Sequence, residues 1–215
     1  FDPVKSFTPV SLVAIAPLIL TVSNDFPARD MKELIAYARA NPGKVSFGTS
    51  GIGSASHLTT ELLMQTAGIE MVHIAYKGTA PALAALLAGD IQMMVDVPSS
   101  MMPHVRAAKI RALGLFAAKR SAGAPEVPTV AEAGGPPIEG STWVMFLMPA
   151  GTPRDVVAKV SAETAKVVGA ADIRARFDQL GIEAVGGTPA EAARFLDAEI
   201  EKWARVITTA KVKPE

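Results

Sequence analysis

Residues 48–57 read GTSGIGSASH and combine three glycines with four hydroxyl side chains. An apolar run precedes this stretch and a helical pattern follows it, so we expect a loop between a strand and a helix. Glycines let a ligand approach the backbone, and the first N–H groups of a helix, which lack partners within it, favour an anion. A tight turn with capping serines and no ligand is the alternative interpretation. The predicted anion-binding residues are Thr49, Ser50, Gly51, Gly53 and Ser54.

The glycine pattern departs from three nucleotide-binding or catalytic motifs. A P-loop needs Lys and then Ser or Thr after its last glycine, but Ser54 and Ala55 follow Gly53. A dinucleotide fingerprint needs a glycine where the chain has Ser56, and a nucleophile elbow needs one where it has Ile52. Each departure counts against an enzyme, and we predict no catalytic residues.

Neither a metal site nor a cofactor is expected. The chain has no cysteine, and His57, His73 and His104 are spaced too widely for a zinc motif. His57 falls in the first turn of the predicted helix, where it either packs or contacts the ligand. His73 lies inside an apolar run, and we interpret it as a core or sheet-face residue.

Two further loops follow predicted strands and carry charged residues. Lys77 and Gly78 precede a predicted helix, where the lysine either completes a carboxylate site or is simply solvated. Asp96 follows another apolar run and either receives a ligand amine or hydroxyl or caps the next helix. Because ligands of α/β sheets bind beyond the carboxyl ends of the strands, we expect the three loops to form one cleft.

Residues 10–117 alternate between apolar runs and helical patterns, which predicts an α/β fold. Val10–Val22 is expected to form one buried strand. Ser54 and Thr79 are the expected N-caps of two helices, the second of which ends at Gly89. Strands that alternate with helices require crossover connections, and therefore a mainly parallel sheet covered on both faces.

The rest of the chain has a different character. Residues 119–140 are rich in Ala, Pro, Gly and Glu and are predicted to form an irregular connection. One strand is expected at Trp143–Met148 and another at Ile182–Val185. Thr152 and Thr188 are each followed by Pro and, three positions on, by an acid, so both are predicted N-caps of helices.

Composition limits the partners. Lys plus Arg and Asp plus Glu number 21 each, so no net charge draws the chain to nucleic acid or to acidic membranes. The longest apolar stretch, Val10–Val22, is too short and too interrupted to cross a bilayer. The chain begins at Phe1 without an initiator Met, and we expect that an upstream segment has been removed.

An ordered set of motifs resembles the Bug (TctC-like) family, the extracytoplasmic solute receptors of tripartite tricarboxylate transporters. The resemblance extends over essentially the whole chain. Its motifs are FDPVKSFTPV from Phe1, FGTSGIGS from Phe47 with the following His57-Leu58, YKG from Tyr76, KRS from Lys119 with EVPTVAEAG from Glu126, and PAGTP from Pro149.

This resemblance implies a type II periplasmic binding protein, in which two α/β lobes with mainly parallel sheets close over a small carboxylate, either an organic acid or an amino acid. Residues 1–20 and 118–215 would supply part of the first lobe and the crossover strands, and residues 21–117 would form the second lobe. The resemblance also implies a signal peptide, a periplasmic location and delivery of the solute to membrane permease subunits.

Family members carry a further segment before the motif at Phe1, including a Gly- and Pro-containing loop that forms the other jaw of the site. We therefore expect the first lobe to be incomplete at its N-terminus. The intact protein is expected to be a monomer, whereas this chain alone could borrow strands in a strand-exchanged dimer.

Two other functions remain open. The effector-binding domain of a LysR-type transcriptional regulator has a similar bilobed fold and would also bind a small anion, although the sequence contains no helix-turn-helix or basic stripe. The third alternative is a hydrolase that acts through Ser50 or Ser54.

Overall fold

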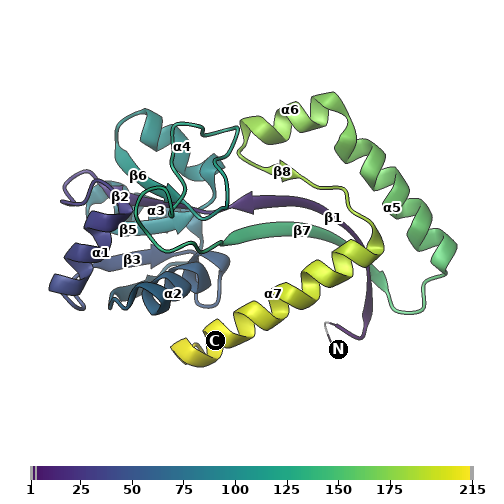
Figure 1. Cartoon of the computed structure of the whole chain (residues 1–215), viewed down its shortest axis with the longest axis horizontal. Helices are drawn as coiled ribbons and strands as arrows, with labels where there is room; N and C mark the ends of the chain where they lie inside the picture. Colours follow the sequence, from purple (N-terminus) through teal and green to yellow (C-terminus); the bar gives the residue numbers. More distant parts are fainter. Residues whose placement is uncertain (1, 3, 214–215) are drawn as a thin grey trace.

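Two sheets lie end to end in the computed structural model, which describes residue 2 and residues 4–213 (Figure 1). The larger sheet has five strands in the order β4-β3-β5-β2-β6. Their bounds are β4 (Val72–Ala75), β3 (Ser46–Thr49), β5 (Met93–Asp96), β2 (Ile19–Ser23) and β6 (Ile110–Leu115). β3 pairs in parallel with β4 and β5, whereas β2 is antiparallel to β5 and β6. Four of the five strands thus run in one direction, and β2 is the exception to the expected parallel sheet.

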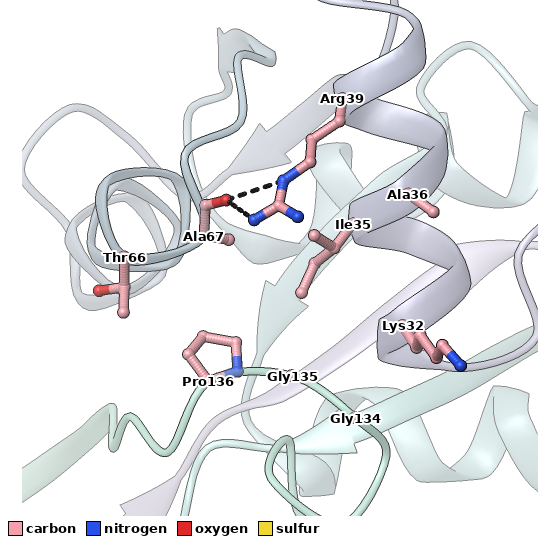
Figure 2. A pocket seen from close by; sticks show the side chains of 9 residues that line it. All are labelled: Lys32, Ile35, Ala36, Arg39, Thr66, Ala67, Gly134, Gly135 and Pro136. Carbon is pink, nitrogen blue, oxygen red and sulfur yellow. Dashed lines mark hydrogen bonds between the residues drawn. The ribbon is translucent and has the colours of Figure 1, made fainter.

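Helices cover both faces of the five-stranded sheet, as the α/β prediction requires. One core cluster joins the sheet to α1 (Met31–Ala40) and α2 (Ala55–Ala67). The other joins it to α3 (Thr79–Ala88) and α4 (Pro98–Arg106). On the first face, the Arg39 Nε of α1 donates to the Ala67 carbonyl of α2 over 3.2 Å, at the edge of a cavity of about 460 Å³ (Figure 2).

The smaller sheet has the order β7-β1-β8 and contains only antiparallel pairs among the described residues. Its strands are β1 (Phe7–Pro17), β7 (Ser141–Pro149) and β8 (Glu183–Ala184). The C-terminal helices α5 (Arg154–Gly169), α6 (Ala171–Gln179) and α7 (Pro189–Ala210) belong to this half, and α7 extends from it towards α2 (Figure 1). The strands expected at Trp143–Met148 and Ile182–Val185 are therefore present.

The run Val10–Val22, which was predicted to be one strand, forms two strands in different sheets. β1 ends at Pro17 and β2 begins at Ile19, so Leu18 lies at the junction. The Leu18 N–H donates to the Gly140 carbonyl over 2.9 Å, and the Leu18 carbonyl accepts from the Phe116 N–H over 2.8 Å. The backbone of Leu18 therefore bonds to segments outside the ladder of β1, and the run divides at this residue. Leu18 is thus hydrogen-bonded to the segment that follows β6 and to the segment that precedes β7, both of which pass between the two sheets.

We retain the expected lobe boundaries as a proposal, with residues 1–20 and 118–215 in one lobe and residues 21–117 in the other. The division of the strands between the two sheets supports it. Residues 117–140 contain no helix or named strand, in agreement with the irregular connection predicted for residues 119–140. No helix in the described part of the chain is long and apolar enough to cross a membrane.

The helix caps predicted at Ser54 and Thr188 are present. Ser54 caps α2, and Thr188 forms a capping box with Glu191 at the start of α7. Thr79 is wrong as a cap of α3, because Gly78 takes the N-cap position. Thr152 is also wrong, since Pro153 precedes α5 and the Thr152 hydroxyl donates to the Pro149 carbonyl.

Candidate functional site

Three loops meet at the carboxyl edge of β4, β3 and β5. These strands are neighbours in the sheet and run in the same direction, so the loops that follow them lie beside one another. The Tyr76 N–H donates to the Thr49 carbonyl over 3.0 Å, and the Gly78 N–H donates to the Ser50 carbonyl over 3.1 Å. The glycine loop (residues 48–54) and the loop of Lys77 are thereby joined through their backbones.

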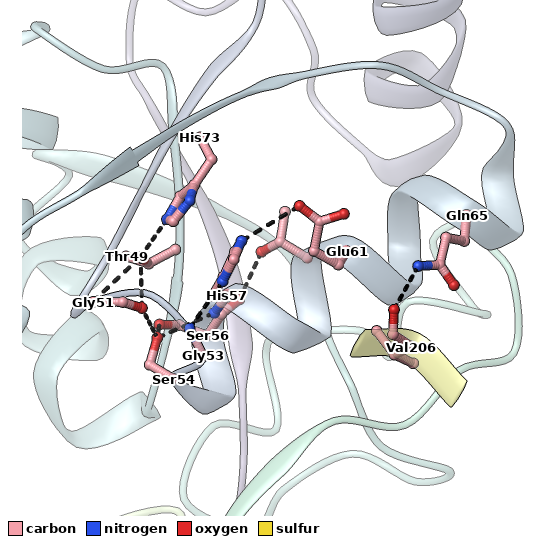
Figure 3. A network of polar contacts seen from close by, with 11 residues as sticks. Thr49, Gly51, Gly53, Ser54, Ser56, His57, Glu61, Gln65, His73 and Val206 are labelled. Carbon is pink, nitrogen blue, oxygen red and sulfur yellow. Dashed lines mark hydrogen bonds and ion pairs between the residues drawn. The ribbon is translucent and has the colours of Figure 1, made fainter. Parts of the chain in front are cut away.

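The glycine loop uses several of its amides internally (Figure 3). The Gly53 N–H donates to His57 Nδ1 over 3.0 Å, and the His57 N–H donates to Ser54 Oγ over 3.3 Å. The Gly51 N–H donates to Thr49 Oγ1 over 3.3 Å. Among the first-turn amides of α2, that of His57 is therefore satisfied by the predicted Ser54 cap, and the amides of Gly51 and Gly53 before the helix are satisfied by Thr49 and His57.

Thr49 is fully buried, and its hydroxyl lies 2.6 Å from His73 Nε2. The His73 ring stacks on the His57 ring with 3.9 Å between centroids and on the Phe47 ring with 5.0 Å between centroids. Burial, and to a smaller extent the nearby His57, lowers the pKa of His73 to about 4, although Glu61 acts in the opposite direction. His73 is therefore neutral at physiological pH, in keeping with its interpretation as a sheet-face residue.

His57 is only 4% exposed and packs in the first turn of α2, which is one of the two roles expected for it. Its Nδ1 accepts a hydrogen bond from Gly53, so the proton of the neutral ring resides on Nε2. That Nε2 lies 3.4 Å from Glu61 Oε1, one helical turn further along α2. The sequence spacing of His57 and Glu61 already allowed this contact, since residues four apart share one face of a helix.

The charged residues of the other two loops differ in exposure. Lys77 is exposed, and Gly78 adopts φ +108° directly before α3. Asp96 is buried: its Oδ2 accepts from the Thr79 hydroxyl over 2.8 Å, and its Oδ1 accepts from the Val97 N–H over 2.7 Å. The Asp96 carboxylate thus holds the starts of α3 and α4 in this conformation, and its contact with a ligand remains a prediction.

A cavity of about 630 Å³ lies between the two sheets, and none of its lining residues was among the predicted binding residues. Its lining includes no residue of the glycine loop. The charged groups that line it are Lys119, Arg120, Arg174 and Lys202, together with Glu139, Asp178, Glu183 and Glu199. The lining residues come from segments far apart in the chain, so no local sequence pattern could reveal them. We call this space the inter-sheet cavity.

Glu199 of α7 is the most constrained charge of the inter-sheet cavity. Its Oε2 accepts from the indole nitrogens of Trp203 over 2.8 Å and of Trp143 over 3.3 Å. Its Oε1 lies 3.2 Å from Lys202 Nζ. Glu199 therefore fastens α7 to β7. No group of three or more His, Cys, Asp or Glu within the described ranges is arranged to hold a metal ion.

Comparison with known proteins identifies the family. A family model described as the tripartite tricarboxylate transporter family receptor matches residues 1–212. A curated relative from Pseudomonas sp. (strain P51), the UPF0065 protein in the tcbD-tcbE intergenic region, is 41% identical over 204 residues, which cover 94% of this chain and 61% of the relative. BugT of Bordetella pertussis is 32% identical over 215 residues, which cover 99% of this chain and 66% of BugT.

Solved structures agree with these sequence matches. R. palustris Rpa4515 with adipate has a TM-score of 0.89 and 35% identity, covering 100% of this chain and 72% of that one. MatC (Rpa3494) from Rhodopseudomonas palustris with bound malate has a TM-score of 0.83 and 30% identity, covering 96% of this chain and 71% of that one. The Bug (TctC-like) resemblance and the periplasmic-binding-protein architecture are thus confirmed.

The chain spans 61% and 66% of the length of the two curated relatives. The family model nevertheless matches nearly every residue of it. The protein therefore belongs to the tripartite tricarboxylate transporter receptor family.

Proposed function

We propose that this chain is the solute-binding part of an extracytoplasmic receptor, which captures a small carboxylate and delivers it to the membrane permease of a tripartite tricarboxylate transporter. The observation that carries the proposal is the family match over residues 1–212. The same membership supports a periplasmic location and a non-enzymatic role. The match gives no support to the LysR-type or hydrolase alternatives.

A dicarboxylate is the ligand class that we propose. The solved relatives Rpa4515 and MatC hold adipate and malate respectively, and both molecules carry two carboxylates. In this chain the exposed Lys77 lies on the loop that is hydrogen-bonded to the glycine loop, so a cation is available beside the hydroxyl groups. A charge-assisted hydrogen bond from lysine to a carboxylate is stronger than a neutral one.

The proposed binding residues are Thr49, Ser50, Gly51, Gly53, Ser54, His57, Lys77, Gly78 and Asp96. They differ in exposure, and Ser50, Gly51, Ser54 and Gly78 are half-buried. Gly53 and Lys77 are exposed and can contact a solute directly, whereas Thr49, His57 and Asp96 are buried and act by holding the loops. We propose that a solute binds to the exposed side of the loops and that closure of the two lobes completes its enclosure.

Titration calorimetry with adipate and malate tests this function. We expect binding by the unaltered chain and at least tenfold weaker binding by Lys77→Glu, because that change places a carboxylate beside the ligand's own charge. Lys213→Glu is the matched control, since it makes the same charge change at the exposed end of the described chain. Equal affinities for all three proteins would contradict the proposed site.

The oligomeric state of this chain remains a prediction. Among the described residues β7 pairs only with β1, and its side chains Val144 and Phe146 are exposed, which supports pairing with a strand from a second copy. Light scattering coupled to size exclusion tests this point. A dimer agrees with the strand-exchange prediction, and a monomer at micromolar concentration contradicts it.

A further inference from the structure

Two imidazole rings lie face to face beside the glycine loop (Figure 3). The centroids of the His57 and His73 rings are 3.9 Å apart and the ring planes differ by 14°. Phe47 stacks against His73 with an interplanar angle of 20°. The stack joins side chains of β3, β4 and α2, so it connects the sheet to the helix whose first turn follows the loop.

Each imidazole holds a different part of the loop. His57 Nδ1 accepts the N–H of Gly53, whose φ is +74°. His73 Nε2 is bonded to Thr49 Oγ1, which in turn accepts the N–H of Gly51, whose φ is +145°. Both glycines therefore adopt conformations that other residues rarely tolerate, and both are connected to the histidine stack.

The protonation state of His57 determines whether its contact with Gly53 persists. A neutral imidazole has one acceptor nitrogen and an imidazolium has none. Gly53 uses the acceptor nitrogen of His57. A proton on Nδ1 would therefore place two N–H groups, that of the ring and that of Gly53, against each other and break the hydrogen bond. A charge on either ring would also lie against the other ring of the stack.

Within the described part of the chain, Glu61 is the carboxylate that acts on the stack. Glu61 on α2 lies 3.4 Å from His57 Nε2, and its carboxylate acts to raise the pKa of His73. β3 contributes Phe47 and Thr49, neither of which titrates in this range. Burial and His57 outweigh Glu61 at His73, whose pKa is lowered to about 4.

We propose that His57 and His73 are positioning residues that hold the glycine loop in its binding conformation only while both rings are neutral. Acidification then loosens the loop and weakens carboxylate binding. The effect on binding rests on the proposed function, whereas the effect on the loop does not.

Amide hydrogen exchange without ligand, followed by NMR between pH 7 and pH 4, tests the effect on the loop. In the unaltered chain we expect the protection of the Gly53 amide to fall about fivefold across this range, as for the loss of one hydrogen bond. His57→Asn offers an oxygen near the position of Nδ1 and should keep the Gly53 protection at every pH. His57→Phe has no acceptor and should lose it at every pH.

His104→Gln is the matched control, because it removes the one histidine outside the stack and should keep the profile of the unaltered chain. An unchanged Gly53 protection in His57→Phe, or the same pH profile in His57→Asn as in the unaltered chain, would overturn the proposal. If His57→Phe does not fold, the comparison of His57→Asn with the unaltered chain decides alone.

Calorimetry with adipate separates this inference from the proposed function. Absence of adipate binding at pH 7, together with the expected Gly53 profile, would reject the function and leave the positioning role in place. Binding of adipate with equal affinity at pH 7 by the unaltered chain and a folded His57→Phe would reject the link from the stack to the ligand.

Discussion

The glycine loop and the inter-sheet cavity are opposites in how they are built. The loop is one continuous stretch of sequence whose polar groups are bonded to each other and to His57. The cavity has a volume of about 630 Å³ and is lined by residues 115–122 and 139–141 together with residues of β8, α6 and α7. A local motif thus shows where glycines allow backbone conformations with positive φ, whereas the position of a cavity depends on how segments far apart in the chain pack.

The two regions also differ in how their charges are satisfied. In the glycine loop, hydroxyl groups and one imidazole accept hydrogen bonds from backbone N–H groups. A solute must therefore bind to groups of the loop that are still exposed, or the loop must change its conformation. The cavity contains four cationic and four acidic side chains, among them the ion pair of Lys202 with Glu199. Four variants and conditions test this comparison, two for each region.

The largest effect is expected for Gly123→Ala beside the inter-sheet cavity. An added Cβ would overlap the Asp178 carbonyl oxygen and would lie 2.7 Å from the Gly181 nitrogen. Both are backbone atoms, so the connection must move away from α6, which we expect to lower the free energy of unfolding by about 3 kcal/mol. Urea denaturation measures this loss. Gly169→Ala has nothing within 4 Å and should not destabilise, and equal stability of the two variants would contradict the contact.

A smaller loss is expected for Glu199→Leu. The change leaves the indole N–H groups of Trp143 and Trp203 without the oxygen that they share, at a cost of about 2 kcal/mol. Urea denaturation followed by tryptophan fluorescence reports the loss. Glu201→Leu is the control on the same helix, because Glu201 pairs with Arg205 at the surface and should contribute less than about 0.5 kcal/mol. A Glu199→Leu variant as stable as this control would show that the cavity wall does not depend on Glu199.

Ser54→Ala probes the glycine loop. The variant removes the oxygen that accepts the His57 N–H, and loss of an N-cap costs about 1 kcal/mol. The control Thr188→Ala removes the cap of α7 at similar cost. Hydrogen exchange should show faster exchange at Gly51 and Gly53 only in Ser54→Ala. The same exchange at these glycines in both variants would mean that the cap does not hold the loop.

The fourth test is a pH dependence of stability from His73. Its pKa is lowered in the folded chain from 6.5 to about 4, so between these values the unfolded chain binds the proton more readily. The free energy of unfolding therefore falls as the pH falls from about 6.5 towards 4, and this contribution ends below 4. His73→Phe should keep the stack and lose this part of the pH dependence. An identical pH dependence of unfolding in both proteins would exclude His73 as its source.

Much of the five-stranded half could be predicted from sequence because its signals are local. The buried face of α1, the Ser54 cap and the strand-helix alternation each depend on residues a few positions apart. The split at Leu18 was missed because it depends on Phe116 and Gly140, which lie far along the chain.

The candidate site was predicted less completely than the fold. The glycines and hydroxyls marked the loop, but their spacing could not show that His57 would satisfy Gly53 or that His73 would bind Thr49. The second contact depends on the parallel register of β3 and β4, which pairs Phe47 with His73. Such a register is fixed by packing across the sheet rather than by either strand alone.

The most direct test of solute binding is an amide chemical-shift titration of the isotope-labelled chain with adipate. The proposed function predicts that the largest shifts occur at residues 50–54 and at Lys77 and Gly78, with small shifts at residues 119–122 of the inter-sheet cavity. Large shifts confined to the cavity residues, with the glycine loop unchanged, would contradict a carboxylate site at the ends of β3 and β4.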